Sequence, residues 1–280
     1  MSTGKEQLDL FVAIIGDVPF RDDREMMSAP MVSLSKKAPA KLEWVGPSGQ
    51  HVEITATDHR SIATIYDFDI IIWAISQMNA AVDRGASPSS TITFRPYDML
   101  KAIRRGRSGR DYERLKEAIN RLRVTRIRTT IRRQNKERLE DFNLLADFVL
   151  DEDEAGRPYG AQITLPRWIH RAVVESREVL AITPEYFDLT SGLDRFLYRL
   201  ARRHAGNGRN NPEGWAFSFK DLHKRTGSPA PFGQFSRDLR KAIYRNNIPT
   251  YHLSEESGAN GPLLRMEFRK LALGQGSLID

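Results

Sequence analysis

The segment Pro96–Leu122, PYDMLKAIRRGRSGRDYERLKEAINRL, holds the pattern that decides the fold. Pro96 suits the first turn of a helix, and the basic, glycine-containing run 104–107 ends that helix. Ser108 is a good N-cap for a second helix. An i, i+3, i+4, i+7 stripe of apolar residues in this second helix is expected to face the core: Leu115, Ala118, Ile119 and Leu122. The segment therefore predicts a helix–turn–helix.

Elements predicted on both sides complete a winged helix. A largely buried helix is expected over residues 61–83, and the alternating strand 91–94 follows it. After the helix pair, strands over 124–131 and 142–150 flank a basic connector and form a two-stranded wing. Helix, strand, helix, turn, helix and wing is the order of a winged-helix domain.

The same order recurs in the second half of the chain. Residues 115–121 and 239–245 share the pattern L-x-x-A-I-x-R at a separation of 124 positions. The elements expected around the second copy are helices over 193–204, 219–225 and 235–246, a strand over 215–217, and a wing from strands 248–253 and 263–268. A motif repeated in the same element of the same order indicates tandem domains.

We therefore predict an α+β fold with two tandem winged-helix domains, over residues 31–175 and 176–275. Residues 1–30 combine charges with a short apolar run and no sustained period, so we expect a flexible N-terminal tail. Residues 276–280 are expected to form a short C-terminal tail.

Positive charge is concentrated in the two segments that hold the helix pairs. The net charge of +7 divides into +11 over residues 101–138, +8 over residues 194–245 and a net negative charge over the rest. This segregation suits contact with a polyanion at two places, and the alternative is a pair of solvated basic helices.

The composition excludes several classes of protein and site. The chain has no cysteine, which excludes disulfides, a thiol nucleophile, iron–sulfur clusters and Cys-rich zinc sites. Its longest apolar runs are far below the roughly 20 residues that span a bilayer. The first residues lack the features of a signal peptide, so a cytoplasmic protein is expected.

Recognisable catalytic motifs are missing as well. The sequence contains no G-x-x-x-x-G-K-[ST] phosphate loop, and its six histidines form neither His-x-His nor H-E-x-x-H. The acidic run Asp151–Glu154 is interpreted as a solvated loop rather than a catalytic pair. We expect a protein that is not an enzyme and that has no metal or cofactor.

The outward faces of the second helices are candidate DNA contacts, because an α-helix fits the major groove and arginine suits guanine edges or phosphates. In the first domain the candidates are Arg110, Arg114, Lys116 and Arg121 on the helix, Arg104, Arg105, Arg107 and Ser108 at its start, and Arg132, Arg133, Lys136 and Arg138 in the wing connector. In the second domain they are Gln234, Ser236, Arg237, Arg240, Lys241 and Arg245 on the helix, and Lys220, Lys224, Arg225, Thr226 and Ser228 before it. The alternative for any one of these arginines is an ion pair with an acidic segment of the chain.

Several segments, in order along the chain, resemble the plasmid replication initiator protein A family. They are 26–36 (MMSAPMVSLSK), 67–74 (DFDIIIWA), 96–100 (PYDML), 186–192 (YFDLTSG) and 196–204 (FLYRLARRH). This resemblance implies a plasmid replication initiator that binds direct repeats (iterons) of origin DNA through two winged-helix domains. It also implies opening of AT-rich DNA, recruitment of a host initiator and the replicative helicase, and a homodimer, formed through the first domain, that acts in repression and copy control. Such a protein works on plasmid DNA in the bacterial cytoplasm.

One motif in the N-terminal tail points to a further partner. Gln7, Leu8, Asp9, Leu10 and Phe11 match the bacterial sliding-clamp-binding pentapeptide Q-L-[SD]-L-F at every position. Leu10 and Phe11 would enter an apolar pocket of the clamp, and Gln7 would bond at its rim. The alternative is a first helical turn that packs on the protein's own core.

Two other functions stay open on the sequence alone. A transcriptional repressor with the same architecture would bind DNA without initiating replication. A nicking or joining enzyme is the rival of a different class, and the missing His-x-His metal pair counts against it.

Overall fold

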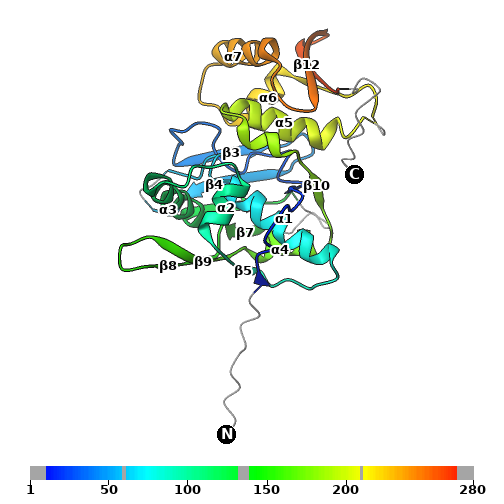
Figure 1. Cartoon of the computed structure of the whole chain (residues 1–280). Coiled ribbons are helices and arrows are strands. Elements are labelled where there is room, and N and C mark those ends of the chain that lie inside the picture. The colour runs from blue at the N-terminus through cyan, green and yellow to red at the C-terminus, as the bar shows by residue number, and fades with distance from the viewer. Residues whose placement is uncertain (1–10, 59–60, 132–138, 209–210, 270–280) are drawn as a thin grey trace.

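Two units of mixed helices and mainly antiparallel strands share one hydrophobic core in the computed structural model of the chain (Figure 1). The structure describes residues 11–58, 61–131, 139–208 and 211–269. We call the part of the fold from β1 to α4 the N-terminal unit and the part from α5 to β13 the C-terminal unit. In Figure 1 the C-terminal unit lies at the top, above the N-terminal unit.

The N-terminal unit contains the predicted helix, strand and helix pair. α1 (Asp69–Asp83) is buried along most of its length, and β5 (Thr91–Phe94) follows it. α2 (Pro96–Ala102) and α3 (Gly109–Val124) form the helix pair. The buried residues of α3 are the four of the predicted stripe: Leu115, Ala118, Ile119 and Leu122. The 3.6-residue period of the sequence therefore identifies the face of α3 that packs on the core.

The strand after α3 does not belong to a wing. β6 (Thr125–Thr129) joins β3 (Lys41–Val45), β4 (His51–Ala56) and β7 (Glu140–Asn143) in a separate sheet of order β3-β4-β6-β7. Ile127 of β6 lies opposite Ile54 of β4, and both side chains are fully buried. The two strands expected after α3 do pair, as β6 and β7, but the prediction that they form the wing is wrong, because β6 also pairs on its other side with β4 of an earlier hairpin. The expected strand 142–150 is divided between β7 and β8.

The wing of the N-terminal unit is formed further along the chain. β8 (Asp147–Glu152) and β9 (Pro158–Thr164) pair antiparallel and extend the sheet to the order β1-β5-β9-β8. The predicted basic connector, 132–138, joins β6 to β7 and lies outside the described residues. The acidic run, interpreted as a solvated loop, begins on β8 and runs into the wing turn.

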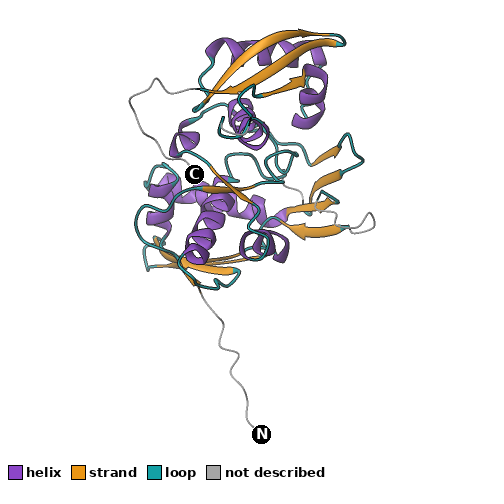
Figure 2. Ribbon diagram, turned by 90° about the vertical axis from the view of Figure 1, so that its right-hand side faces the viewer, coloured by secondary structure: helices purple, strands orange, loops and turns teal. Residues whose placement is uncertain are grey.

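The C-terminal unit repeats the helix, strand, helix, helix, strand, strand order. Its elements are α5 (Gly192–His204), β11 (Trp215–Ser218), α6 (Phe219–Thr226), α7 (Phe232–Arg245), β12 (Tyr251–Gly258) and β13 (Gly261–Phe268). The strands form an antiparallel sheet of order β11-β13-β12, which matches the order β5-β9-β8 of the other unit (Figure 2). The repeat seen in the sequence is thus a repeat of topology.

Residues 11–30, expected to be part of a flexible tail, belong to the fold. β1 (Phe11–Val12) runs parallel to β5, and β2 (Arg21–Asp23) pairs with β10 (Val179–Ala181). Met26 and Met27 are buried in the core. The tail prediction is wrong for these residues, because their partners lie far away in the sequence and leave no local period.

Two short helices complete the connection between the units. α4 (Arg167–Val174) packs against α1. The 3-10 helix η1 (Pro184–Asp188) follows β10 and leads into α5. The chain therefore crosses from one unit to the other along β2 and α1.

Candidate nucleic-acid interface

Helix α3 begins at a capping box and presents two cations to solvent near its start. Ser108 donates its backbone N–H (3.0 Å) and its hydroxyl (2.6 Å) to Oδ2 of Asp111. These bonds lower the pKa of the Asp111 carboxyl. Ser108 therefore caps the helix as predicted. Arg110 and Arg114 are exposed, and 65% of the Arg114 side chain is accessible.

Two other cations of α3 pair with residues of other segments, whereas Arg114 pairs with Asp111 of its own helix. Lys116 Nζ lies 2.6 Å from a carboxylate oxygen of Glu152 on β8. Arg121 donates to both carboxylate oxygens of the buried Asp67, over 2.8 and 2.9 Å. Arg121 therefore holds α3 on the body of the unit, where the sequence had suggested a DNA contact.

The turn between α2 and α3 is also held by arginines. Arg104 pairs with Asp188 of η1, and Arg105 pairs with the fully buried Asp69 at the start of α1. Arg107 is exposed and lies over the ring of Tyr97, 5.0 Å from its centroid. Arg104 and Arg105 thus fix the turn, although Arg104 stays exposed, and Arg107 is exposed without such an ion pair to the body of the unit.

The wing beside α3 carries negative charge. Asp151 and Glu152 end β8, and Asp153 and Glu154 lie in the turn that follows. Arg157 neutralises part of this charge, because its Nε donates a hydrogen bond of 2.8 Å to Oδ2 of Asp153. Acidic groups next to the helix oppose the approach of phosphates to this side of α3.

Helix α7 presents a more basic face. Arg237 and Lys241 are exposed, and Gln234 accepts a hydrogen bond of 2.7 Å from Arg237. Arg240 forms a bidentate pair with Glu255 of β12. Exposed pairs of this kind contribute little stability, so these cations can exchange their partners for phosphates. Lys220 and Lys224 of α6 are exposed as well.

Three residues predicted as contacts in the second unit are buried. Arg225 pairs with Asp221 over 2.8 Å and donates to the carbonyl oxygen of Ser28 over 2.7 Å. Thr226 and Ser236 donate to carbonyls of the preceding turn of their own helices. They support the fold where DNA contacts had been expected.

Ser228 lies in the turn between α6 and α7 and is partly buried. Its hydroxyl accepts a hydrogen bond of 3.3 Å from the N–H of Ala230. The hydroxyl therefore stabilises the turn.

The arginine that ends the repeated motif makes the same contact in both units. Arg245 donates to both oxygens of Asp194 over 2.9 and 3.0 Å, as Arg121 does to Asp67. In each unit this contact ties the second helix of the pair to the start of the long helix, α1 or α5. Arg245 is therefore also a structural cation.

Asp67 and Asp194, which bind these two arginines, occur in the same short sequence pattern. Asp67 and Asp194 each lie three positions after a hydroxyl residue, Thr64 or Ser191, which is the pattern of a capping box. Ser191 accepts the N–H of Asp194, and Thr64 donates its N–H to Asp67. Sequence reasoning missed this pair, although the repeated [ST]-x-x-D pattern could have found it.

Tyr244 is a second residue that sequence reasoning missed. It is 92% exposed, and it lines a shallow hollow with Arg237, Arg240, Lys241 and Arg245. Gln234, Arg237, Lys241 and Tyr244 recur at i, i+3, i+7 and i+10, so they form one stripe along α7. This helical spacing in the sequence could have identified Tyr244 as a member of the exposed face of α7.

Eight of the predicted site residues fall in segments that the structure does not describe. Those outside the described residues are Gln7, Leu8, Asp9, Leu10, Arg132, Arg133, Lys136 and Arg138. Phe11, the last residue of the clamp motif, lies in β1, where it is partly buried and packs against the core.

The described residues show neither a metal-binding cluster nor a membrane-spanning helix. They contain no group of three or more acidic or histidine side chains arranged to hold a metal ion. None of their helices is long and apolar enough to cross a membrane.

The family model for Replication initiator protein A matches residues 21–253, which is most of the chain. The chain belongs to this family. The match confirms the resemblance seen in the sequence, and members of the family are generally non-catalytic DNA-binding proteins. This initiator is also 32% identical over 238 residues to a protein of Wigglesworthia glossinidia brevipalpis that is named as a replication protein, with 84% of each chain covered.

Solved structures share the fold of the initiator. A crystal structure of domains 2 and 3 of RctB matches 88% of this chain and 98% of that chain, with a TM-score of 0.61 and 15% identity. A second structure of RctB domains 2-3 matches 88% of this chain and 97% of that chain, with a TM-score of 0.56 and 13% identity. At this level of identity the comparison establishes the mixed α and β fold.

Proposed function

We propose that this initiator binds direct repeats at a plasmid origin through both helix pairs and that it has no catalytic activity. The supporting observation is that the second helix of each pair projects exposed cations: Arg110 and Arg114 from α3, and Arg237 and Lys241 from α7. Such a helix fits the major groove, where arginine bonds to guanine. Residues 31–175 and 176–275 then act as two winged-helix DNA-binding domains, with residues 11–30 packed against both.

Helix α7 carries the larger share of the binding free energy in this proposal. When the repeated motifs are aligned, Arg237 and Lys241 of α7 correspond to Glu113 and Glu117 of α3. The turn of the C-terminal wing, residues 257–262, has no charged residue, whereas the N-terminal wing is acidic. A neutral wing tip can approach the DNA backbone without electrostatic repulsion.

The later steps of initiation belong to the proposal through the family. They are opening of AT-rich DNA, recruitment of a host initiator and helicase, and repression by a dimer. A repressor with the same architecture would bind the same repeats, so melting of a supercoiled origin by the purified chain is the assay that separates the two functions.

Binding of the sliding clamp through residues 7–11 is a separate part of the proposal. Phe11 packs on the core from β1 and would have to leave that strand to enter a pocket on the clamp. The variant Leu10→Ala with Gln7→Ala tests the motif without disturbing β1. Unchanged clamp binding in a titration would remove the clamp from the list of partners.

The experiment for the main proposal compares a direct-repeat duplex from the cognate origin with a scrambled duplex across a salt series. A preference for the repeat that survives at about 0.2 M salt supports sequence recognition by this chain. Equal and steeply salt-dependent binding to both duplexes would mean that the cations provide only non-specific attraction.

A further inference from the structure

A row of arginines on α5 docks the C-terminal unit on the earlier part of the chain. Arg195, Arg199, Arg202 and Arg203 recur at i, i+4, i+7 and i+8, and each donates to an acceptor that precedes α5. The acceptors are Asp69, Asp22, the carbonyl oxygen of Ala181 and Glu25, in that order. These four cations lie in the basic segment that the charge pattern had suggested for DNA, but they point into the protein.

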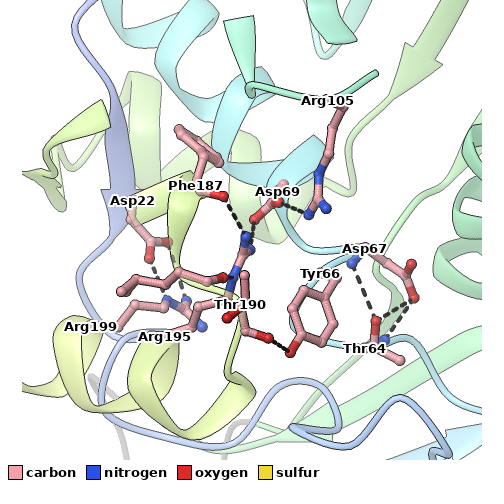
Figure 3. Close-up of polar contacts among 11 residues, drawn as sticks. Asp22, Thr64, Tyr66, Asp67, Asp69, Arg105, Phe187, Thr190, Arg195 and Arg199 are labelled. Carbon is pink, nitrogen blue, oxygen red and sulfur yellow. Dashed lines mark hydrogen bonds and ion pairs between the residues drawn. The ribbon is translucent and has the colours of Figure 1, made fainter. Parts of the chain in front are cut away.

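Arg195 is the most enclosed member of the row, with 1% of its side chain exposed. Its Nη1 lies 2.5 Å from Oδ1 of Asp69, and its Nε and Nη2 donate to the carbonyls of Leu189 (2.7 Å) and Phe187 (3.0 Å). Figure 3 shows the guanidinium between these groups and Tyr66. All three guanidinium nitrogens therefore have acceptors, and the orientation of Arg195 is determined by the N-terminal unit and by the segment around η1.

The carboxylate of Asp69 is shared between the units. One oxygen accepts from Arg195 of α5, and the other accepts from Arg105 in the turn between α2 and α3 (Figure 3). Asp69 itself is fully buried at the start of α1. A single carboxylate thus connects the helix pair of the N-terminal unit to the first helix of the C-terminal unit.

This connection extends to α3 and α7, the second helix of each helix pair. Asp67, two residues before Asp69, holds Arg121 of α3. Asp194, next to Arg195, holds Arg245 of α7. The ion pairs and the short peptide segments between them form a continuous series from α3 to α7 through the starts of α1 and α5.

We infer that Asp69 and Arg195 are positioning residues that set the orientation of α3 relative to α7, and hence the spacing at which the two halves of a repeat are bound. Buried ion pairs resist displacement, because a carboxylate that loses its partners in the interior is not solvated by water. Two binding surfaces on one rigid body reinforce each other only where the spacing of the sites matches. The inference about spacing rests on the proposed function, whereas the inference about orientation does not.

Orientation can be measured without DNA, because the chain has no native cysteine. Arg123→Cys on α3 and Asn247→Cys after α7 place spin labels at two exposed positions outside the proposed DNA contacts. Pulsed electron paramagnetic resonance on the full chain then gives the distribution of label distances. We expect a narrow distribution with the native Arg195 and one about twofold wider with Arg195→Met, because the shared carboxylate loses its link to α5.

Arg199→Met is the matched control. Arg199 lies one turn further along α5, is as buried as Arg195 and pairs with Asp22 of β2, which is not part of a helix pair. The control should lose stability and keep the narrow distribution. If the Arg195→Met variant does not fold, the double variant Asp69→Asn with Arg195→Met is used in its place, because it removes both charges of the pair. An unchanged distribution in the Arg195 variant, or equal broadening in the control, would overturn the inference.

A DNA experiment tests the consequence for spacing. Insertion of two base pairs between the halves of a repeat should weaken binding by the native chain about tenfold, and binding by the Arg195 variant about threefold or less. Binding to each half alone should not change. An identical loss in both proteins would overturn the role in spacing. If the native chain shows no preference for the repeat, the proposed function fails, and the label distances still decide whether Asp69 and Arg195 set the orientation.

Discussion

Arg237 and Arg195 carry the same charge in opposite settings. Arg237 is exposed on α7, whereas Arg195 is enclosed by Asp69 and by backbone carbonyls. Only an accessible guanidinium can replace the counterions of a phosphate backbone, so the two residues contribute differently to DNA binding. At the scale of residues, the partner of each arginine decides its role.

Arg237→Ala should relax sequence preference. If its guanidinium bonds to a guanine, binding to the origin repeat weakens by about 1–3 kcal/mol, while binding to scrambled DNA changes little. Competition titrations with both duplexes measure the difference, and Arg114→Ala tests α3 in the same way. Lys37→Ala, at an exposed cation outside both helix pairs, serves as the control. Equal weakening on both duplexes would assign Arg237 to a phosphate.

His204 should make folding stability depend on pH. Its ring packs against Trp215 and Phe217, and burial, with Arg203 and Arg225 nearby, lowers its pKa to about 4. The unfolded state, with a pKa near 6.5, binds more protons between these values, so stability falls as the pH drops through this window.

Urea unfolding at about pH 7 and pH 4.5 tests this prediction. The native chain should lose about 2 kcal/mol more than His204→Gln between the two conditions. Parallel losses in both proteins would show that His204 is not the group responsible.

Helices α3 and α7 contain the same sequence motif but present different charges to solvent. Both helices bury the Leu and Ala of L-x-x-A-I-x-R and use its Arg to bind an aspartate. Their outward positions differ, because Glu113 and Glu117 stand where α7 has Arg237 and Lys241. At the scale of elements, the two helices share their buried contacts, but the charges on their outward faces differ.

Glu113→Arg with Glu117→Lys would give α3 the charge pattern of α7. If α3 faces DNA, affinity should rise, and the slope of log K against log salt should steepen by up to about 2. Filter binding or fluorescence anisotropy over a salt series measures both quantities. Glu175→Arg, on an exposed position after α4, changes charge outside the helix pairs and should have a smaller effect. An unchanged slope would place α3 away from DNA.

Residues from the start of the chain lie between the two units and stabilise the whole fold. Asp22 of β2 is fully buried and bonds to Arg199 of α5 over 2.6 Å. Met26 and Met27 belong to the common core. At the scale of the whole molecule, residues 11–30 connect the units.

Asp22→Asn should destabilise the whole chain by about 3–5 kcal/mol, because it leaves Arg199 buried without its counterion. Asp22→Asn with Arg199→Met should recover much of this loss. Chemical denaturation followed by circular dichroism measures both effects, with the exposed Asp147→Asn as the control. A loss below about 1 kcal/mol would mean that the Asp22–Arg199 pair does not stabilise the fold.

Local pattern was enough to find the helices, the repeat and the hairpins β6–β7 and β12–β13, and it was not enough to pair strands that lie far apart in the sequence. The predicted limits of α3 and α7 agree with the structure to within three residues. The wing of the N-terminal unit was misplaced because β6 pairs with β4, about 70 residues earlier in the chain. Among candidate contacts, exposure separates Arg110, Arg114, Arg237 and Lys241 from Arg121 and Arg225.

The sequence by itself determined the two helix pairs, their buried faces and the family, because helix periodicity and ordered motifs are local properties of the chain. Tertiary structure decided which strands form the wings, which arginines face solvent and how the units are joined. The reason is that strand pairing and ion pairing depend on groups that meet only after folding. The single carboxylate of Asp69, between Arg105 and Arg195, is the clearest case, since its partners are 36 and 126 residues away.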